Sequence, residues 1–151
     1  MKNINKFFET LGEIWRDITV IEFLMRCALA QKKGDISKLP KPPYAKGRIY
    51  QEYPESFSPK YFSEVVKKFN NQFPKIAIPL ELVELRNAMA HGVIAEINHK
   101  GIDELVKFKK QEDNDTLKIE FGMPLDQQRI DGIRISLRNL RRHIANEATD
   151  K

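Results

Sequence analysis

The sequence predicts an all-α fold, a bundle of about four to five helices with a small β-hairpin inserted before the last helix. Several long segments carry apolar residues at spacings of three and four, which is the periodicity of an amphipathic helix. In one stretch, 105–121, apolar and charged residues alternate instead, as they do in strands. The chain has 151 residues, 41% of them apolar and 31% charged. This length is sufficient to bury a core, so a single domain over 1–151 is expected.

The first predicted helix runs from Lys6 to Gln31 and would be roughly 40 Å long. Gly34 ends its pattern. Cys27 is the single cysteine and lies inside this apolar stretch, which indicates a buried thiol in a reducing compartment. The apolar seam of the helix consists of Leu11, Ile14, Ile18, Ile21, Met25 and Leu29.

The segment 34–57 is predicted to be a loop rich in proline and tyrosine, because its proline density rules out a regular helix. Tyrosines alternate there with cations, among them Lys46 and Arg48. Such a mixture can stack bases and hold phosphates, so Lys46 and Arg48 are candidate RNA contacts. The tyrosines can equally pin the loop onto the bundle. The residues concerned are Pro40, Pro42, Pro43, Pro54, Tyr44, Tyr50 and Tyr53.

Two further helices follow the loop. Ser58 as N-cap and Pro59 at the first helical position predict the start of one, which Pro74 stops. Pro79 begins the next, which is predicted to continue towards Ile97.

The last predicted helix runs from about Asp126 to Asn146. Its apolar seam consists of Ile130, Ile133, Leu137, Leu140 and Ile144. A second stripe, Arg134, Arg138 and Arg141, lies beside that seam and suits phosphate contacts along a groove. The same stripe also suits ordinary solvation of a helix, and cations in the last turn favour the helix dipole.

The β-hairpin is predicted over 105–121. Val106 and Phe108 alternate with lysines, and Leu117, Ile119 and Phe121 continue the alternation after the polar run QEDND, which supplies a turn. An isolated hairpin is marginal in water, so this one is expected to lie on the bundle or on a partner.

The charge and hydropathy of the chain indicate its surroundings. The formal net charge is +5 and the isoelectric point is about 9.3, which suggests a polyanionic partner. There is no apolar run near the length that crosses a bilayer, and no export leader at the N-terminus. A cytoplasmic protein without a membrane partner is therefore expected.

The segment LVELRNAMAHG places Arg86, Asn87 and His91 in an otherwise apolar helix. Arginine, four intervening residues and histidine, with a polar residue directly after the arginine, resembles the signature of HEPN domains. These are helical bundles of about this length found in RNases, toxin–antitoxin pairs and antiphage systems. The resemblance covers the motif helix closely and the rest of the chain only in its arrangement.

The resemblance implies a metal-independent endoribonuclease, acting as a toxin or defence effector, that needs no cofactor. Cleavage would proceed by transesterification and leave a 2′,3′-cyclic phosphate and a 5′-hydroxyl. His91 would transfer protons, and Arg86 would grip phosphate bidentately. Asn87 and Glu84 lie one turn and two turns before His91, so Asn87 is assigned to the catalytic group and Glu84 to a supporting role.

One position departs from the pattern of HEPN toxins that pair with nucleotidyltransferase antitoxins. In those toxins a tyrosine follows the histidine by two positions and is the modified residue. This chain has Val93 there, which excludes silencing by adenylylation at that site.

A geometric problem arises from the five-residue spacing, which puts Arg86 roughly 140° around an ideal helix from His91. Both reach one phosphate only if the arginine side chain wraps round, the helix is distorted, or two copies of the motif meet. HEPN nucleases are generally dimers whose motifs face each other across one cleft. The resemblance therefore implies a homodimer through the motif helix, with RNA as substrate and an antitoxin protein as a possible partner.

Two other hypotheses remain open. The chain could be a non-catalytic HEPN module that binds RNA, a nucleotide or a partner protein. It could also be a purely structural helical adaptor in which both Arg86 and His91 are buried in salt bridges, with Glu81 or Glu84 as a partner of Arg86. His99 and His143 show no metal-ligand spacing, so no metal site is expected.

Overall fold

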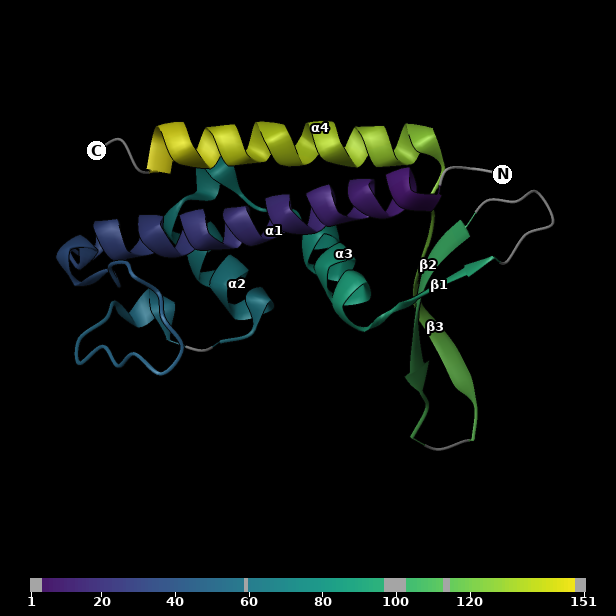
Figure 1. Ribbon diagram of the computed structural model, residues 1–151, viewed down its shortest axis with the longest axis horizontal. Coiled ribbons are helices and arrows are strands. Elements are labelled where there is room, and N and C mark those ends of the chain that lie inside the picture. Colours follow the sequence, from purple (N-terminus) through teal and green to yellow (C-terminus); the bar gives the residue numbers. More distant parts are fainter. Residues whose placement is uncertain (1–3, 59, 97–102, 113–114, 149–151) are drawn as a thin grey trace. The chain divides into compact units, whose positions relative to one another are not determined.

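A computed structural model describes residues 4–58, 60–96, 103–112 and 115–148 (Figure 1). The chain divides into two compact units, which we call unit 1 and unit 2. Unit 1 comprises Met1–Arg16 and Pro79–Arg138, and unit 2 comprises Asp17–Ile78 and Asn139–Lys151. Helices α1 (Ile4–Lys32) and α4 (Gln127–His143) contribute residues to both. Among the described residues, no helix is both long and apolar enough to cross a membrane.

The prediction of an all-α fold is wrong, because unit 1 contains a three-stranded antiparallel sheet in the order β1-β2-β3. The strands are β1 (Val93–Glu96), β2 (Asp103–Lys110) and β3 (Leu117–Pro124). The described part of the chain is therefore mixed α/β, although mostly helical. Both strands of the expected hairpin extend beyond 105–121, and β1 occupies sequence that was expected to be helical.

The motif helix α3 (Leu80–His91) ends earlier than predicted because the chain changes from helix to strand at Gly92. The Gly92 N–H donates to the carbonyl oxygen of Ala88 at 2.6 Å, and its backbone is already extended, with ψ −179°. A Cβ at this position would collide with the Ala88 carbonyl and lie 2.8 Å from the carbonyl oxygen of Val106 in β2. Strand β1 follows at once, with Val93 paired to Val106. The expected helical continuation is therefore wrong over 92–96, and its last residue, Ile97, lies outside the described residues.

Unit 1 buries apolar side chains from α3, from the sheet and from its parts of α1 and α4. Helix α3 contacts β2 directly (Figure 1). The buried members are Ile14, Leu82, Val83, Leu85, Ala88, Leu105, Val106, Met123, Leu125, Ile130 and Leu137.

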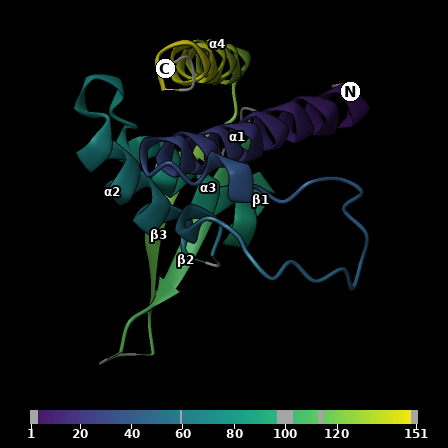
Figure 2. The same cartoon turned by 90° about the vertical axis from the view of Figure 1, so that its left-hand side faces the viewer.

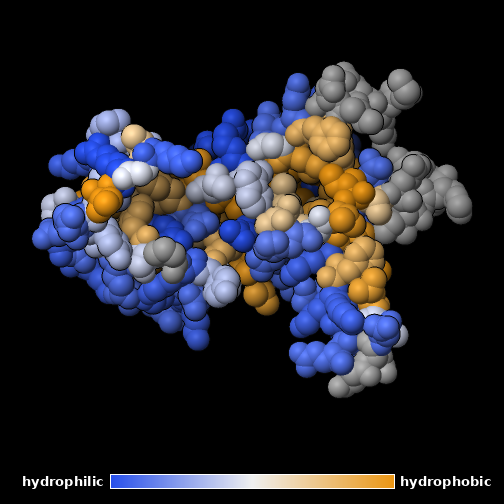
Figure 3. Space-filling view, turned by 60° about the horizontal axis from the view of Figure 1, so that its bottom comes forward, coloured by the Kyte–Doolittle hydropathy of each residue, from blue (hydrophilic) through white to orange (hydrophobic). Residues whose placement is uncertain are grey.

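A bulge in β3 separates two parts of the hairpin. Lys107 pairs with Phe121 and Phe108 pairs with Ile119, which leaves Glu120 without a partner in the register. The sequence alternation had placed Leu117, Ile119 and Phe121 on one face, and the bulge interrupts this alternation before Phe121. Phe108, Leu117 and Ile119 are 47%, 69% and 58% exposed, and Figure 3 shows apolar side chains gathered along the strands.

Unit 2 is built on its part of α1, on α2 (Phe62–Gln72) and on the π-helical turn η4 (Ile144–Ala148). The first helix matches its predicted range within two residues at the N-terminal end and one at the C-terminal end. Asn70 donates to the carbonyl oxygen of Ile78 at 3.0 Å and accepts from its N–H at 2.7 Å. These two hydrogen bonds join the segment after η3 (Pro74–Ile76) to α2. The core residues are Ile18, Ile21, Met25, Ala28, Leu29, Ala30, Phe62, Val65, Val66, Phe69, Ile76, Ile78, Ile144 and Ala148.

Helix α2 begins at Phe62, with Tyr61 rather than Ser58 at the N-cap. Ser58 instead ends the short helix η2 (Glu55–Phe57) with an extended backbone. Arg26 of α1 holds this turn, because its guanidinium donates to the carbonyl oxygens of Ser56 at 2.6 Å and Ser58 at 3.2 Å. Pro59, the expected first helical residue, lies outside the described residues.

The only regular elements in the segment 34–57 are the short helices η1 (Ile36–Lys38) and η2 (Figure 2). Two tyrosines hold it by bonds within the segment. Tyr44 donates to the carbonyl oxygen of Pro40 at 3.0 Å, and Tyr50 donates to that of Lys41 at 2.7 Å. These hydroxyls therefore bind the loop to itself rather than to a helix.

Replacing Gly92 with alanine is expected to destabilise the protein, because two backbone carbonyls occupy the space of the new methyl group. We expect the free energy of unfolding to fall by about 1–3 kcal/mol in chemical denaturation. Gly132→Ala in α4 is the matched control, since nothing lies within 4 Å of its Cβ position and alanine is the better helix former. Equal stability of the two variants would contradict the close approach at Gly92.

Cys27 is half-buried rather than fully buried as the sequence predicts, and this partial burial raises the pKa of its thiol. We therefore expect Cys27 to react slowly in the folded protein. At pH 8 a smaller fraction is then thiolate, the form that is alkylated. The rate of modification by iodoacetamide should rise when the protein is unfolded in guanidinium. The midpoint of the rate against pH should lie above that of an unstructured cysteine peptide, and identical profiles would count against this burial.

Candidate functional site

One exposed stripe of α3 carries three of the four residues that the motif singled out. Leu80, Glu84, Asn87 and His91 follow at spacings of four, three and four, so they share one face of the helix. Glu84 and His91 are exposed and Asn87 is half-buried. His91 is the last residue of α3, where a cation also favours the helix dipole. The stripe thus presents an imidazole, an amide and a carboxylate together.

Arg86 lies on a different side of α3. Its neighbours Leu85 and Leu82 are buried, and the arginine itself is half-buried. The guanidinium carbon is 5.9 Å from the ring centroid of Trp15 in α1, within the distance of a cation–π interaction. The sequence offered glutamates as partners for Arg86, but it gave no signal for the tryptophan, which is 71 positions away.

The separation of Arg86 and His91 follows from the regularity of the helix. Helix α3 is α-helical from Leu80 to His91, so a roughly 140° angle between the two positions applies. A distorted helix is therefore not what brings them together. The remaining routes to a common site are a wrapped arginine side chain or a second copy of the motif.

The expected arginine stripe of α4 is largely engaged in ion pairs within each unit. In unit 1, Arg134 donates to Glu13 at 2.6 Å. In unit 2, Arg141 donates to Asp17 at 3.3 Å. Arg138 is exposed. Two of the three guanidiniums therefore already have carboxylate partners on α1, which an RNA phosphate would have to displace.

The loop candidates Lys46 and Arg48 are both exposed. Arg48 donates to the carbonyl oxygen of Pro43 at 2.8 Å, and its guanidinium carbon is 5.1 Å from the ring centroid of Tyr50. These contacts give Arg48 a role in the shape of the loop, and its remaining donors stay compatible with phosphate contact.

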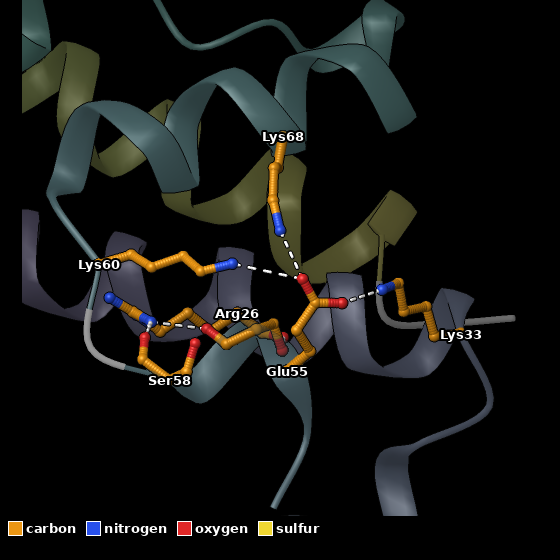
Figure 4. Close-up of polar contacts among 7 residues, drawn as sticks. Arg26, Lys33, Glu55, Ser58, Lys60 and Lys68 are labelled. Atoms are coloured by element: carbon orange, nitrogen blue, oxygen red, sulfur yellow. Dashed lines mark hydrogen bonds and ion pairs between the residues drawn. The ribbon is translucent and has the colours of Figure 1, made fainter.

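A group of cations that the sequence reasoning missed surrounds Glu55 in unit 2 (Figure 4). Lys60 and Lys68 reach Oε1 at 3.3 Å and 2.7 Å, and Lys33 pairs with Oε2. We call Lys33, Lys60 and Lys68 the lysine cluster. Hydrogen bonds from all three ammonium groups lower the pKa of Glu55, and the bond to Glu55 raises that of Lys68. The cluster joins positions up to 35 residues apart, so no local motif could have revealed it.

Comparisons with protein-family models, with curated proteins and with solved structures give no match for this chain.

The contact between Arg86 and Trp15 predicts a spectroscopic change, because Trp15 is the only tryptophan of the chain. Arg86→Ala should expose the indole, shift its emission to longer wavelength and reduce stability by about 0.5–2 kcal/mol. Fluorescence spectra and thermal melts measure both effects. Arg138→Ala, which removes an exposed arginine from the same unit, should change neither. An unaltered Arg86→Ala spectrum and melt would show that the cation–π contact is absent.

Proposed function

We propose that this chain is a metal-independent endoribonuclease of the HEPN type, a toxin or defence effector that cleaves RNA at a site shared by two chains. The observation that carries the proposal is the exposed stripe of α3, with His91 open to solvent beside Asn87 and Glu84. An exposed imidazole can transfer protons near a phosphate, and the neighbouring amide and carboxylate can orient it.

The reaction proceeds by transesterification. The 2′-oxygen of a ribose attacks the neighbouring phosphorus as its proton passes to a base, and the bond from phosphorus to the 5′-oxygen breaks as that oxygen receives a proton. His91 transfers one of these protons. Arg86 stabilises the negative charge that develops on the phosphate, since its guanidinium remains charged in any protein environment. Asn87 and Glu84 orient the imidazole of His91.

Two chains supply the site in this proposal. Because Arg86 and His91 diverge on a regular helix, the His91 stripe of one chain acts with Arg86 of another across a symmetric homodimer. Pairing of the motif helices forms a single cleft in which RNA binds. An antitoxin protein that covers the exposed stripe would silence the enzyme by blocking this cleft.

A second function is favoured by the contact between Arg86 and Trp15. An arginine that serves mainly to join α3 to α1 fits a non-catalytic HEPN module that binds RNA, a nucleotide or a partner protein. In that case His91→Ala leaves binding and any growth phenotype unchanged.

The decisive measurement is cleavage of labelled RNA in EDTA by the wild type and by His91→Ala. General acid–base catalysis contributes about 10²–10⁴-fold, so the variant should lose at least about 10² in rate. His143→Ala is the matched control, since His143 is also an exposed histidine at the end of a helix, α4. The proposal fails if the wild type cuts no RNA, or if His91→Ala cuts as fast as the control.

Mixing two inactive variants tests whether the site is shared. In a mixed dimer, the Arg86→Ala chain retains His91 and the His91→Ala chain retains Arg86. The two residues lie on opposite chains, so the mixed dimer should regain activity. Random exchange should restore about a quarter of the wild-type rate, because about half of the dimers are mixed and each has one complete pair. No recovery, with mixed dimers demonstrated by tagged chains, would place both groups of each site on one chain.

A further inference from the structure

The positive charge of this protein is concentrated in unit 2, whereas the motif residues belong to unit 1. Unit 2 contains 14 lysines and arginines against 8 aspartates and glutamates, whereas unit 1 contains 12 against 13. The net charges are therefore +6 and −1, which together give the +5 of the whole chain. Long-range attraction of a polyanion follows the local surplus of charge, so it acts mainly on unit 2.

Within unit 2 the lysine cluster is arranged around one small anionic group. Lys33 follows α1, Lys60 precedes α2 and Lys68 lies within α2, yet all three ammonium groups converge on the carboxylate of Glu55 (Figure 4). Three lysines around one glutamate leave an excess of positive charge, which Glu64 near Lys68 offsets in part. Exposed ion pairs contribute little to stability. Lys33, Lys68 and Glu55 are 59%, 46% and 50% exposed, and Lys60 is 26% exposed. Stability alone therefore does not account for three cations at one carboxylate.

Exposed aromatic rings adjoin the lysine cluster in the chain. Tyr61 directly follows Lys60 and is 81% exposed, and Tyr53 precedes Glu55 by two residues and is 50% exposed. An exposed aromatic ring offers a flat face on which a base can stack. Lysines that hold phosphates beside rings that stack bases are the combination with which proteins bind single-stranded nucleic acid.

We infer that the lysine cluster, with Tyr53 and Tyr61, is a binding site for single-stranded nucleic acid on unit 2. Phosphates contact the ammonium groups that Glu55 holds together, and bases stack on the tyrosine rings. The site goes beyond the proposed cleavage site and does not depend on it, because nothing in it requires His91 to be catalytic. RNA and single-stranded DNA share the chemistry that it recognises.

The experiment measures the affinity of the full chain for a fluorescent 20-nucleotide oligo-uridine, with oligo-thymidine and heparin as parallel probes. All proteins carry His91→Ala, so that cleavage is absent and failure of the proposed nuclease leaves the binding result intact. The logarithm of the affinity is followed against the logarithm of salt concentration. Neutralising three phosphate contacts should reduce the slope by about 2.

The triple variant Lys33→Gln, Lys60→Gln and Lys68→Gln should show that smaller slope. The matched control is Lys109→Gln, Lys110→Gln and Lys118→Gln, which removes the same charge from exposed lysines of unit 1. Tyr53→Ala and Tyr61→Ala should each weaken binding about tenfold without changing the slope. Glu55→Gln should tighten binding, because it removes the carboxylate that competes with phosphate. Circular dichroism verifies that each variant is folded. If the triple variant unfolds, the single substitution Lys68→Gln takes its place.

Binding of oligo-uridine alone, or of both oligonucleotides, supports the inference when the lysine and tyrosine variants weaken it as described. No binding at 50 mM salt overturns it. An equal loss in the unit 1 control also overturns it, since attraction would then depend only on net charge. Equal binding of heparin with no effect of either tyrosine would replace the nucleic-acid site by a general polyanion surface.

Discussion

The close approach of two backbones at Gly92 is the constraint on which unit 1 depends. The carbonyl oxygens of Ala88 and Val106 both occupy the space where a side chain would begin, so only glycine allows α3 to end against β2. This ending places β1 in register with β2, completes the sheet and buries Val106. It also makes His91 the last helical residue, with its imidazole exposed. The glycine that follows the histidine in the motif therefore has a structural reason that is independent of catalysis.

The helices could be predicted because their evidence is local. The three-four periodicity of α1 and the apolar seam of α4 repeat over many turns, and each needs only its own residues. The end of α3 could not be predicted in the same way, because it depends on β2, whose strand lies more than ten residues further along the chain. Apolar residues such as Val93 and Ile94 satisfy a helical pattern as readily as a strand. Tertiary pairing decided between them, and it turned an expected all-α fold into a mixed one.

The candidate site shows the same division between local and distant information. Spacing on an ideal helix was sufficient to place Glu84, Asn87 and His91 on one stripe and Arg86 elsewhere. The contact of Arg86 with Trp15 could not be predicted from local spacing, because Trp15 belongs to a different helix, α1. The arginines of α4 also have partners that the sequence did not indicate, because Glu13 and Asp17 on α1 accept from two of them, while phosphate contact by the stripe stays a prediction. Charges that look available in a sequence are often paired across helices.

The different environments of the cations indicate how charge can be divided between structure and binding. Arg134 meets the carboxylates of Glu13 and Asp131, and Arg141 meets that of Asp17, so little positive charge remains there for a phosphate. At Glu55 three lysines share one carboxylate, and the surplus remains after the pairing. A phosphate approaching the first arrangement must break an ion pair to gain another of similar strength. A phosphate approaching the second adds an anion where cations are in excess, and mutual repulsion among the lysines is relieved as it binds. Electrostatics alone therefore favours anion binding at the lysine cluster over the arginine stripe.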